Sequence, residues 1–196
     1  MRKLSSAAML VLLAGWFPLG AQNNPSPASD NPMAGLNLAD PNAPATLTGF
    51  ADTFDHHLVV LADGHAKPFA ASTLSGVKYW AFYYSASWCP PCRAFTPKLV
   101  EFYNTFKAQH PNFELIFVNH DNDADAMLEY MKTDSMPWPA VRFDDIESTK
   151  ANRYCGPGIP DLVLVDEHGK VLSDSFNGQD YRGPEAVIDD IQSMVH

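Results

Sequence analysis

Two cysteines separated by two residues, Cys89 and Cys92, are the residues of this chain best suited to chemistry. Trp88 precedes them, and Pro90 and Pro91 lie between them. A disulfide that closes so short a loop removes little conformational entropy from the unfolded chain, so it would stabilise a fold only weakly. A passive bridge is the alternative in an exported protein, but this spacing favours a pair that opens and closes in thiol–disulfide exchange.

The residues on either side of the pair predict a strand and a helix. Residues 77–84 are an almost continuous apolar and aromatic run, which is the pattern of a strand buried on both faces. From Pro90 to about Gln109, apolar residues recur at spacings of three and four, which predicts a helix. A cysteine at the start of a helix lies beside unpaired N–H groups and the positive end of the helix dipole, which stabilise a thiolate. We therefore expect Cys89 to be the attacking thiolate and Cys92, one turn into the helix, to be less exposed.

The two intervening prolines bear on the redox properties of the pair. Pro90 and Pro91 occupy positions in the first turn, where a missing N–H costs little. They also remove two potential hydrogen-bond donors near the Cys89 sulfur, and no histidine or lysine stands between the cysteines. We expect a moderately lowered pKa of Cys89 and a reducing potential, nearer about −270 mV than about −120 mV. Pro97 predicts a kink in the helix.

The remaining patterns predict one α/β domain over residues 50–196. Turns at residues 63–64 and 167–169 predict hairpins, and two later helices are expected to follow Asp123 as an N-cap and Pro184 at the first turn. Strands are expected at residues 57–61, 77–84, 113–119, 161–166 and 170–175, and helices at residues 90–109, 124–132 and 185–195, with a short helix that ends near Tyr154. This order indicates a central mixed β-sheet flanked by helices.

Residues 1–21 have the pattern of a signal peptide. Arg2 and Lys3 are followed by an uncharged apolar run over residues 7–20, with small residues before Gln22. The run is too short to span a bilayer comfortably, and an uncleaved anchor is the alternative. We therefore expect an exported protein, either periplasmic or secreted.

Residues 22–49 are rich in proline, asparagine and alanine without apolar periodicity, so they are expected to form a disordered linker. The chain has 13 basic and 23 acidic residues, a formal net charge of −10. Removal of residues 1–21 takes away two basic residues and no acidic one, which moves this charge from −10 to −12. We expect no nucleic-acid partner, no stable membrane insertion after cleavage, and a monomer.

Three ordered motifs carry a family resemblance. Residues 85–97, SASWCPPCRAFTP, resemble the active-site stretch of the tryparedoxin and nucleoredoxin branch of the thioredoxin superfamily. Residues 136–138, MPW, resemble the same branch, and residues 158–160, GIP, are similar to the cis-proline loop of the superfamily. The match covers roughly residues 57–196 in order. It implies a thioredoxin-like three-layer fold.

The resemblance also implies a role for each residue of the motifs. Cys89 would be the nucleophile, Cys92 the resolving thiol, and Trp88, Pro90 and Pro91 would flank the site. Substrate binding would fall to two further residues: the backbone of Ile159 would pair with an extended substrate peptide, and Pro160 would be the cis-proline facing the disulfide. From the residues alone, a trans proline that begins a strand is the alternative.

Three residues stand outside this pattern. Many thioredoxins carry a buried acid six residues before the first cysteine, and here that residue is Tyr83. This puts carboxylate-assisted deprotonation of Cys92 in doubt. The alternative is that Tyr83 is simply an aromatic residue of the core. Cys155 is either a half-buried free thiol or a third redox or intermolecular thiol. His120 is the one candidate metal ligand and is more simply a loop residue, so we expect no metal site.

These observations lead to an exported thiol–disulfide oxidoreductase that acts on protein disulfides, in the reductase direction. The resemblance implies no cofactor beyond the redox-active disulfide of Cys89 and Cys92, and it requires an electron donor, either a membrane reductase or a small thiol. A disulfide oxidase or isomerase is the alternative within the same chemistry. A non-catalytic peptide- or metal-binding module is the alternative from another class.

Overall fold

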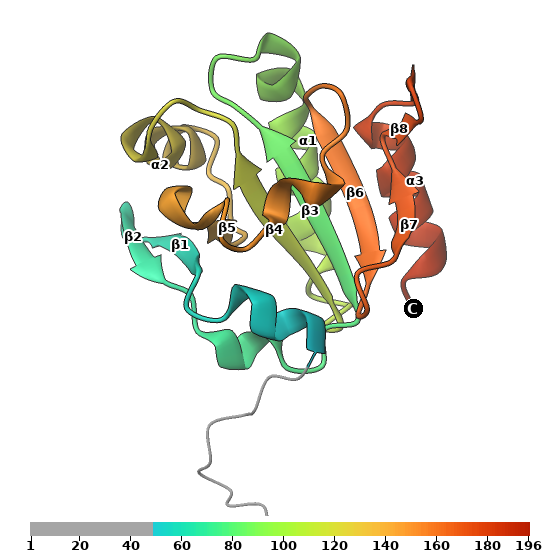
Figure 1. Ribbon diagram of the computed structural model, residues 1–196, viewed down its shortest axis with the longest axis horizontal. Coiled ribbons are helices and arrows are strands. Elements are labelled where there is room, and N and C mark those ends of the chain that lie inside the picture. Colours follow the sequence, from blue (N-terminus) through green and yellow to red (C-terminus); the bar gives the residue numbers. More distant parts are fainter. Residues whose placement is uncertain (1–48) are drawn as a thin grey trace, which may run out of the picture. The chain divides into compact units, whose positions relative to one another are not determined.

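A computed structural model of the protein describes residues 49–196, and Figure 1 shows how the elements are arranged. Seven strands form one mixed sheet in the order β2-β1-β5-β4-β3-β6-β7. β3 pairs with β4 in parallel and with β6 in antiparallel orientation, so it lies inside the sheet. The expected mixed sheet is confirmed. The strands are β1 (Leu58–Ala62), β2 (His65–Pro68), β3 (Tyr79–Ser85), β4 (Phe113–Asn119), β5 (Ala140–Val141), β6 (Asp161–Asp166) and β7 (Val171–Asp174).

Two hydrophobic clusters cover the two faces of the sheet, because side chains alternate along a strand. Ala81 and Tyr83 of β3 belong to the cluster that contains buried residues of the three α-helices. Trp80, Phe82 and Tyr84 belong to the other cluster, which contains residues of 3-10 helices. The three layers that the family resemblance implies are therefore present, with short 3-10 helices on the second face. The helices are α1 (Pro90–Phe106), α2 (Ala124–Thr133), α3 (Pro184–Met194), η1 (Gly49–Phe54), η2 (Ala71–Leu74), η3 (Phe143–Asp145) and η4 (Ala151–Tyr154).

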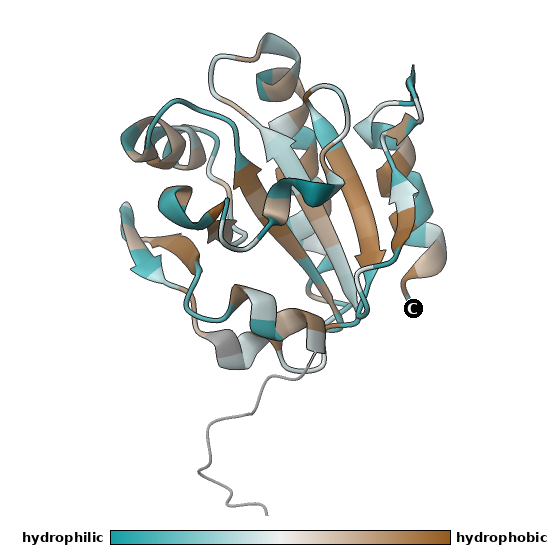
Figure 2. Ribbon diagram, viewed as in Figure 1, coloured by the Kyte–Doolittle hydropathy of each residue, from teal (hydrophilic) through white to brown (hydrophobic). Residues whose placement is uncertain are grey.

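The central strands and helix starts follow from local sequence. All seven residues of β4 are buried, and Figure 2 shows the apolar residues concentrated along β6 and much of β4. The side chain of Asp123 caps α2 by accepting a hydrogen bond from the Ala126 N–H at 2.7 Å, as the sequence predicts. α1 ends at Phe106, three residues before the expected end, and beyond it the Gln109 and His110 N–H groups bond carbonyls three residues back, at Phe106 and Lys107.

Among the strands, two short features were not predicted from the sequence. β5 has two residues and joins β1 to β4 within the main sheet. β8 (Phe176–Asn177) and β9 (Asp180–Tyr181) form a separate two-stranded hairpin between β7 and α3. The expected signal peptide over residues 1–21, and the expected linker except Gly49, lie outside the described residues. Within residues 49–196, none of the helices has the length and apolar character needed to cross a membrane.

Candidate active site

The two cysteines form a disulfide at the first turn of α1. Their sulfur atoms are 2.09 Å apart and their Cα atoms 5.2 Å apart. Cys89 is the N-cap of α1, and its sulfur accepts a hydrogen bond from the Cys92 N–H at 3.3 Å. Pro90 and Pro91 occupy the first two helical positions and have no N–H to offer. The Cys92 N–H is therefore the hydrogen-bond donor that the first turn of the helix supplies to the Cys89 sulfur.

The loop between β3 and α1 is held by residues that follow β4. Asp121 accepts hydrogen bonds from the Ser87 N–H at 2.8 Å and the Ser87 hydroxyl at 2.7 Å. The indole N–H of Trp88 donates to the His120 carbonyl at 3.1 Å, while 59% of the Trp88 residue surface stays exposed. Sequence analysis did not single out Asp121, although the carboxyl end of a strand next to β3 is a place where such a side chain is expected. These contacts fix the direction in which Cys89 is presented.

The two cysteines differ only slightly in burial when they are joined by the disulfide. Cys92 is fully buried and Cys89 is 3% exposed. Cys89 directly follows the exposed Trp88, whereas Cys92 lies further along the chain, within the first turn of α1. The start of α1 therefore places Cys89 next to an exposed side chain and keeps Cys92 inside the first turn.

Four hydroxyl groups form a buried hydrogen-bonded chain next to Cys92. Tyr83 and Thr96 share a hydrogen bond of 2.8 Å, Thr96 and Tyr130 one of 2.7 Å, and Tyr130 and Ser85 one of 2.9 Å. The Cys92 carbonyl accepts from the Thr96 hydroxyl at 2.9 Å, and the Tyr83 hydroxyl lies 3.3 Å from the same carbonyl. These bonds support the first turn of α1 from within the core. Of the five residues, sequence analysis discussed only Cys92 and Tyr83 individually, while Ser85 and Thr96 lie within the motif of residues 85–97.

This chain of hydroxyls offers no base to Cys92. Burial raises the pKa of Tyr83 far above its ordinary value near 10, and burial also raises the pKa of Tyr130. Both phenols therefore stay protonated near neutral pH and cannot take a proton from Cys92. Tyr83 fills the position of the acid found in many thioredoxins as a packed aromatic residue that also hydrogen-bonds the backbone of Cys92.

The cis-proline loop faces the disulfide from β6. The Ile159–Pro160 peptide bond is cis, and the Ile159 carbonyl oxygen lies 3.8 Å from the Cys89 sulfur. Asp161, the first residue of β6, accepts a hydrogen bond from the Gly156 N–H at 2.7 Å and so closes the loop on itself. Burial, and secondarily the nearby Asp174 carboxylate, raises the pKa of Asp161 to about 6. The structure thus brings Ile159 and Pro160 together with the Cys89–Cys92 pair.

Comparison with known proteins identifies the family to which this chain belongs. A family model described as thioredoxin-like matches residues 76–171. Nucleoredoxin of Bos taurus is 36% identical over 140 residues, which are 66% of this chain and 32% of the relative. Native tryparedoxin I of Crithidia fasciculata is 31% identical, with a TM-score of 0.56 over 75% of this chain and 94% of that structure. The chain belongs to the thioredoxin superfamily, in its tryparedoxin- and nucleoredoxin-like branch.

The similarity to nucleoredoxins covers only part of those proteins. Probable nucleoredoxin 1 of Arabidopsis thaliana is 42% identical over 98 residues, which are 49% of this chain and 16% of the relative. The chain therefore spans about a third or less of the curated relatives it matches. The solved tryparedoxins, by contrast, are matched over most of their length.

The third cysteine of this family member lies near the site but is not activated. The Cys155 sulfur is 3.8 Å from His120 Nε2. Burial, and secondarily the Asp161 and Asp174 carboxylates, raises the pKa of Cys155 to about 12, and burial lowers the pKa of His120. Near neutral pH this is a neutral thiol beside a neutral imidazole, which favours the half-buried free thiol over a third redox nucleophile. Within residues 49–196, no three His, Cys, Asp or Glu side chains are grouped to hold a metal ion.

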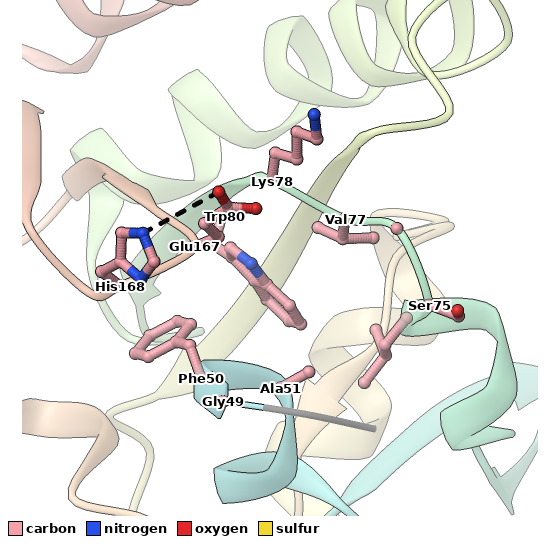
Figure 3. A pocket seen from close by; sticks show the side chains of 11 residues that line it. Gly49, Phe50, Ala51, Ser75, Val77, Lys78, Trp80, Glu167 and His168 are labelled. Atoms are coloured by element: carbon pink, nitrogen blue, oxygen red, sulfur yellow. Dashed lines mark ion pairs between the residues drawn. The ribbon is translucent and has the colours of Figure 1, made fainter. Parts of the chain in front are cut away.

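A pocket of about 410 Å³ lies at the other end of β3. Figure 3 shows Trp80, Lys78 and Phe50 among its walls. Glu167 and His168 also line the pocket, and His168 Nε2 lies 3.9 Å from Glu167 Oε1. Trp80 is five residues before the end of β3, about 17 Å along an extended strand. The pocket contains no cysteine, so it is separate from the redox pair.

Proposed function

We propose that the protein is an exported thiol–disulfide oxidoreductase that reduces disulfides in protein substrates. One arrangement carries the proposal. A redox pair is placed at the N-terminus of α1, and its outer sulfur lies 3.8 Å from the backbone of the cis-proline loop. The membership of the chain in the thioredoxin superfamily supports the same chemistry.

The reaction begins with both cysteines reduced. The Cys89 thiol loses its proton to solvent, and the thiolate attacks one sulfur of the substrate disulfide. The substrate S–S bond breaks, a mixed disulfide forms between Cys89 and the substrate, and one substrate thiolate leaves. The Cys92 thiolate then attacks the Cys89 sulfur, which releases the second substrate thiolate. Two electrons pass to the substrate, and the Cys89–Cys92 disulfide remains.

Each step uses a feature of this chain. The start of α1 stabilises the Cys89 thiolate through the Cys92 N–H and the helix dipole. Cys92 lies within one helical turn of the mixed disulfide, so its attack is intramolecular. Burial of Cys92 limits its direct reaction with large substrates. Because the neighbouring phenols stay protonated, the proton of Cys92 must leave by way of solvent or the departing substrate thiolate.

We infer the reducing direction from the small number of groups that stabilise the Cys89 thiolate. In strong oxidants of this superfamily the reduced form is stabilised, whereas weak stabilisation of the thiolate favours the disulfide form. Here the prolines remove two donors and the first turn supplies one N–H. A disulfide oxidase or isomerase remains the alternative, and a potential near the oxidising end of the scale would favour it.

Turnover requires an electron donor that reduces the Cys89–Cys92 disulfide after each cycle. We propose a membrane reductase or a small thiol. One solved relative, a tryparedoxin II that is 29% identical, is complexed with glutathionylspermidine, which supports the small thiol. Export is proposed from residues 1–21 alone. N-terminal sequencing of the exported protein is expected to begin at Gln22, and an intact N-terminus would point to an anchor instead.

Reduction of insulin disulfides tests the catalytic proposal. The wild-type protein with dithiothreitol as electron source is expected to precipitate the insulin B chain faster than dithiothreitol alone, and Cys89→Ser is expected to abolish this acceleration. Cys92→Ala should instead accumulate a mixed disulfide, which identifies the natural substrates after trapping. Equal acceleration by wild type and Cys89→Ser would contradict the catalytic proposal, and a non-catalytic binding module would be the remaining interpretation.

A further inference from the structure

The β8–β9 hairpin lies against the cis-proline loop. Figure 1 places β8 at the end of the sheet where β6 begins. The Tyr181 hydroxyl donates a hydrogen bond to the Pro160 carbonyl at 2.9 Å. The ring of Phe176, on the paired strand, is 4.8 Å from the ring of Tyr181. The hairpin therefore contacts the segment that faces Cys89, although neither β8 nor β9 is part of the main sheet.

Phe176 packs on the same loop from its other end. A Cβ atom built on Gly156 would lie 2.5 Å from Phe176 Cδ2, and one built on Gly158 would lie 3.8 Å from Phe176 Cζ. The first distance is too short for any real side chain, so the ring rests directly on the glycine backbone. Two aromatic residues thus hold residues 156–160 at both ends, by a ring contact and by a hydrogen bond.

The hairpin is itself fixed to the core, which makes it a rigid support. The carbonyl of buried Ser175 accepts hydrogen bonds from the Arg182 N–H at 2.7 Å and the Gly183 N–H at 3.3 Å. The Ser175 hydroxyl accepts from the Leu162 N–H at 2.8 Å and donates to the Leu162 carbonyl at 3.0 Å. The base of the hairpin is therefore tied to β6, immediately after the loop it supports.

We propose that Tyr181 and Phe176 are positioning residues for extended protein substrates. They hold the Ile159 backbone in the conformation that pairs with a substrate main chain next to Cys89. This inference rests on the proposed function and names its substrate class: peptide segments long enough to pair with the loop, rather than small disulfides.

Tyr181→Phe tests the inference because it removes the hydroxyl and keeps the ring. Loss of one hydrogen bond releases the loop, which must then be ordered when an extended substrate binds. The KM for insulin is expected to rise roughly 2- to 10-fold, with kcat within about twofold of wild type. The rate with hydroxyethyl disulfide, which is too small to pair with the loop, is expected to stay unchanged. Phe176→Leu is expected to act in the same direction.

Tyr154→Phe is the matched control. The Tyr154 hydroxyl donates to the Gly169 carbonyl at 2.9 Å, a bond of the same kind and length away from the disulfide. This variant is expected to match wild type on both substrates. An unchanged KM for insulin in Tyr181→Phe, equal slowing of both substrates by it, or an equal rise in KM in Tyr154→Phe would overturn the inference.

The same assays separate failure of the inference from failure of the proposed function. If wild type is active, Cys89→Ser is inactive and Tyr181→Phe matches wild type, the inference alone is wrong. If Cys89→Ser is as active as wild type on both substrates, the proposed function is wrong and the inference falls with it.

Discussion

At the scale of single residues, Asp161 is a titrating group that contacts the cis-proline loop and makes the stability of the protein depend on pH. Its carboxylate accepts the Gly156 N–H, yet burial raises its pKa to about 6 from an ordinary value near 3.8. Between these values the folded protein binds more protons than the unfolded chain. The free energy of unfolding therefore falls as pH rises from about 4 to about 6, and the loss persists above pH 6.

Asp161→Asn is expected to remove this loss. The amide is isosteric and uncharged, and its oxygen can still accept the Gly156 N–H. In urea unfolding, the free energy of unfolding of the variant minus that of wild type should increase by roughly 2 kcal/mol from pH 4.5 to pH 7.5. Asp166→Asn is a control without this trend. Backbone hydrogen bonds from Lys170 and His168 lower the pKa of Asp166, so its contribution to the free energy of unfolding changes only below about pH 4, and the difference from wild type should stay nearly constant over this range. A constant difference between wild type and Asp161→Asn across this range would contradict the expectation.

At the scale of elements, the loop between β3 and α1 depends on a side chain from the end of β4. Asp121→Ala would leave the Ser87 N–H and hydroxyl without their acceptor. We expect a loss of about 1–3 kcal/mol in the free energy of unfolding and a fall of roughly tenfold in kcat/KM for insulin, because Cys89 is presented less accurately. Urea unfolding and the insulin assay measure the two effects.

Asp123→Ala is the matched control for this prediction. It lies two residues away and removes a hydrogen bond of the same kind, the N-cap bond of α2 to the Ala126 N–H. A loss of about 1 kcal/mol in stability is expected, with insulin reduction close to wild type. Equal losses of activity in the two variants would show that stability, and not the presentation of Cys89, limits the rate.

The same scale shows which elements sequence patterns reveal. Residues 113–119 were predicted with the observed bounds because their run of apolar residues reflects burial on both faces, and Asp123 marks its own helix start. β5 and the β8–β9 hairpin have two residues per strand, too few for any periodicity. They form because distant partners supply the hydrogen bonds.

The candidate site divides in the same way. Cys89, Cys92 and Pro160 are marked by spacing and by family motif, so sequence alone brings them forward. Asp121 and Tyr181 act through contacts with residues 34 and 21 positions away, respectively, and neither lies in a motif. Only the folded sheet brings such residues to one end of the molecule, which is why pattern analysis passed over them.

At the scale of the whole molecule, the direction of electron flow is a difference in stability between two folded states. A pair with weakly stabilised thiolates favours the disulfide form, so equilibration with glutathione is expected to give a potential nearer about −270 mV than about −120 mV. A value at the oxidising end would mean that the reduced protein is the favoured form.

Thermal unfolding measures the same balance independently. If the protein is a reductant, its oxidised form should be the more stable by about 2 kcal/mol, which for a domain of this size raises Tm by roughly 4–8 °C over the form kept reduced with a phosphine. Cys89→Ser cannot form the disulfide, so its Tm should not respond to the reductant. In a strong oxidant the order reverses, because the reduced form is then the stabilised one. A reduced protein that melts above the oxidised one would therefore reverse the direction proposed for this pair and assign it to disulfide formation.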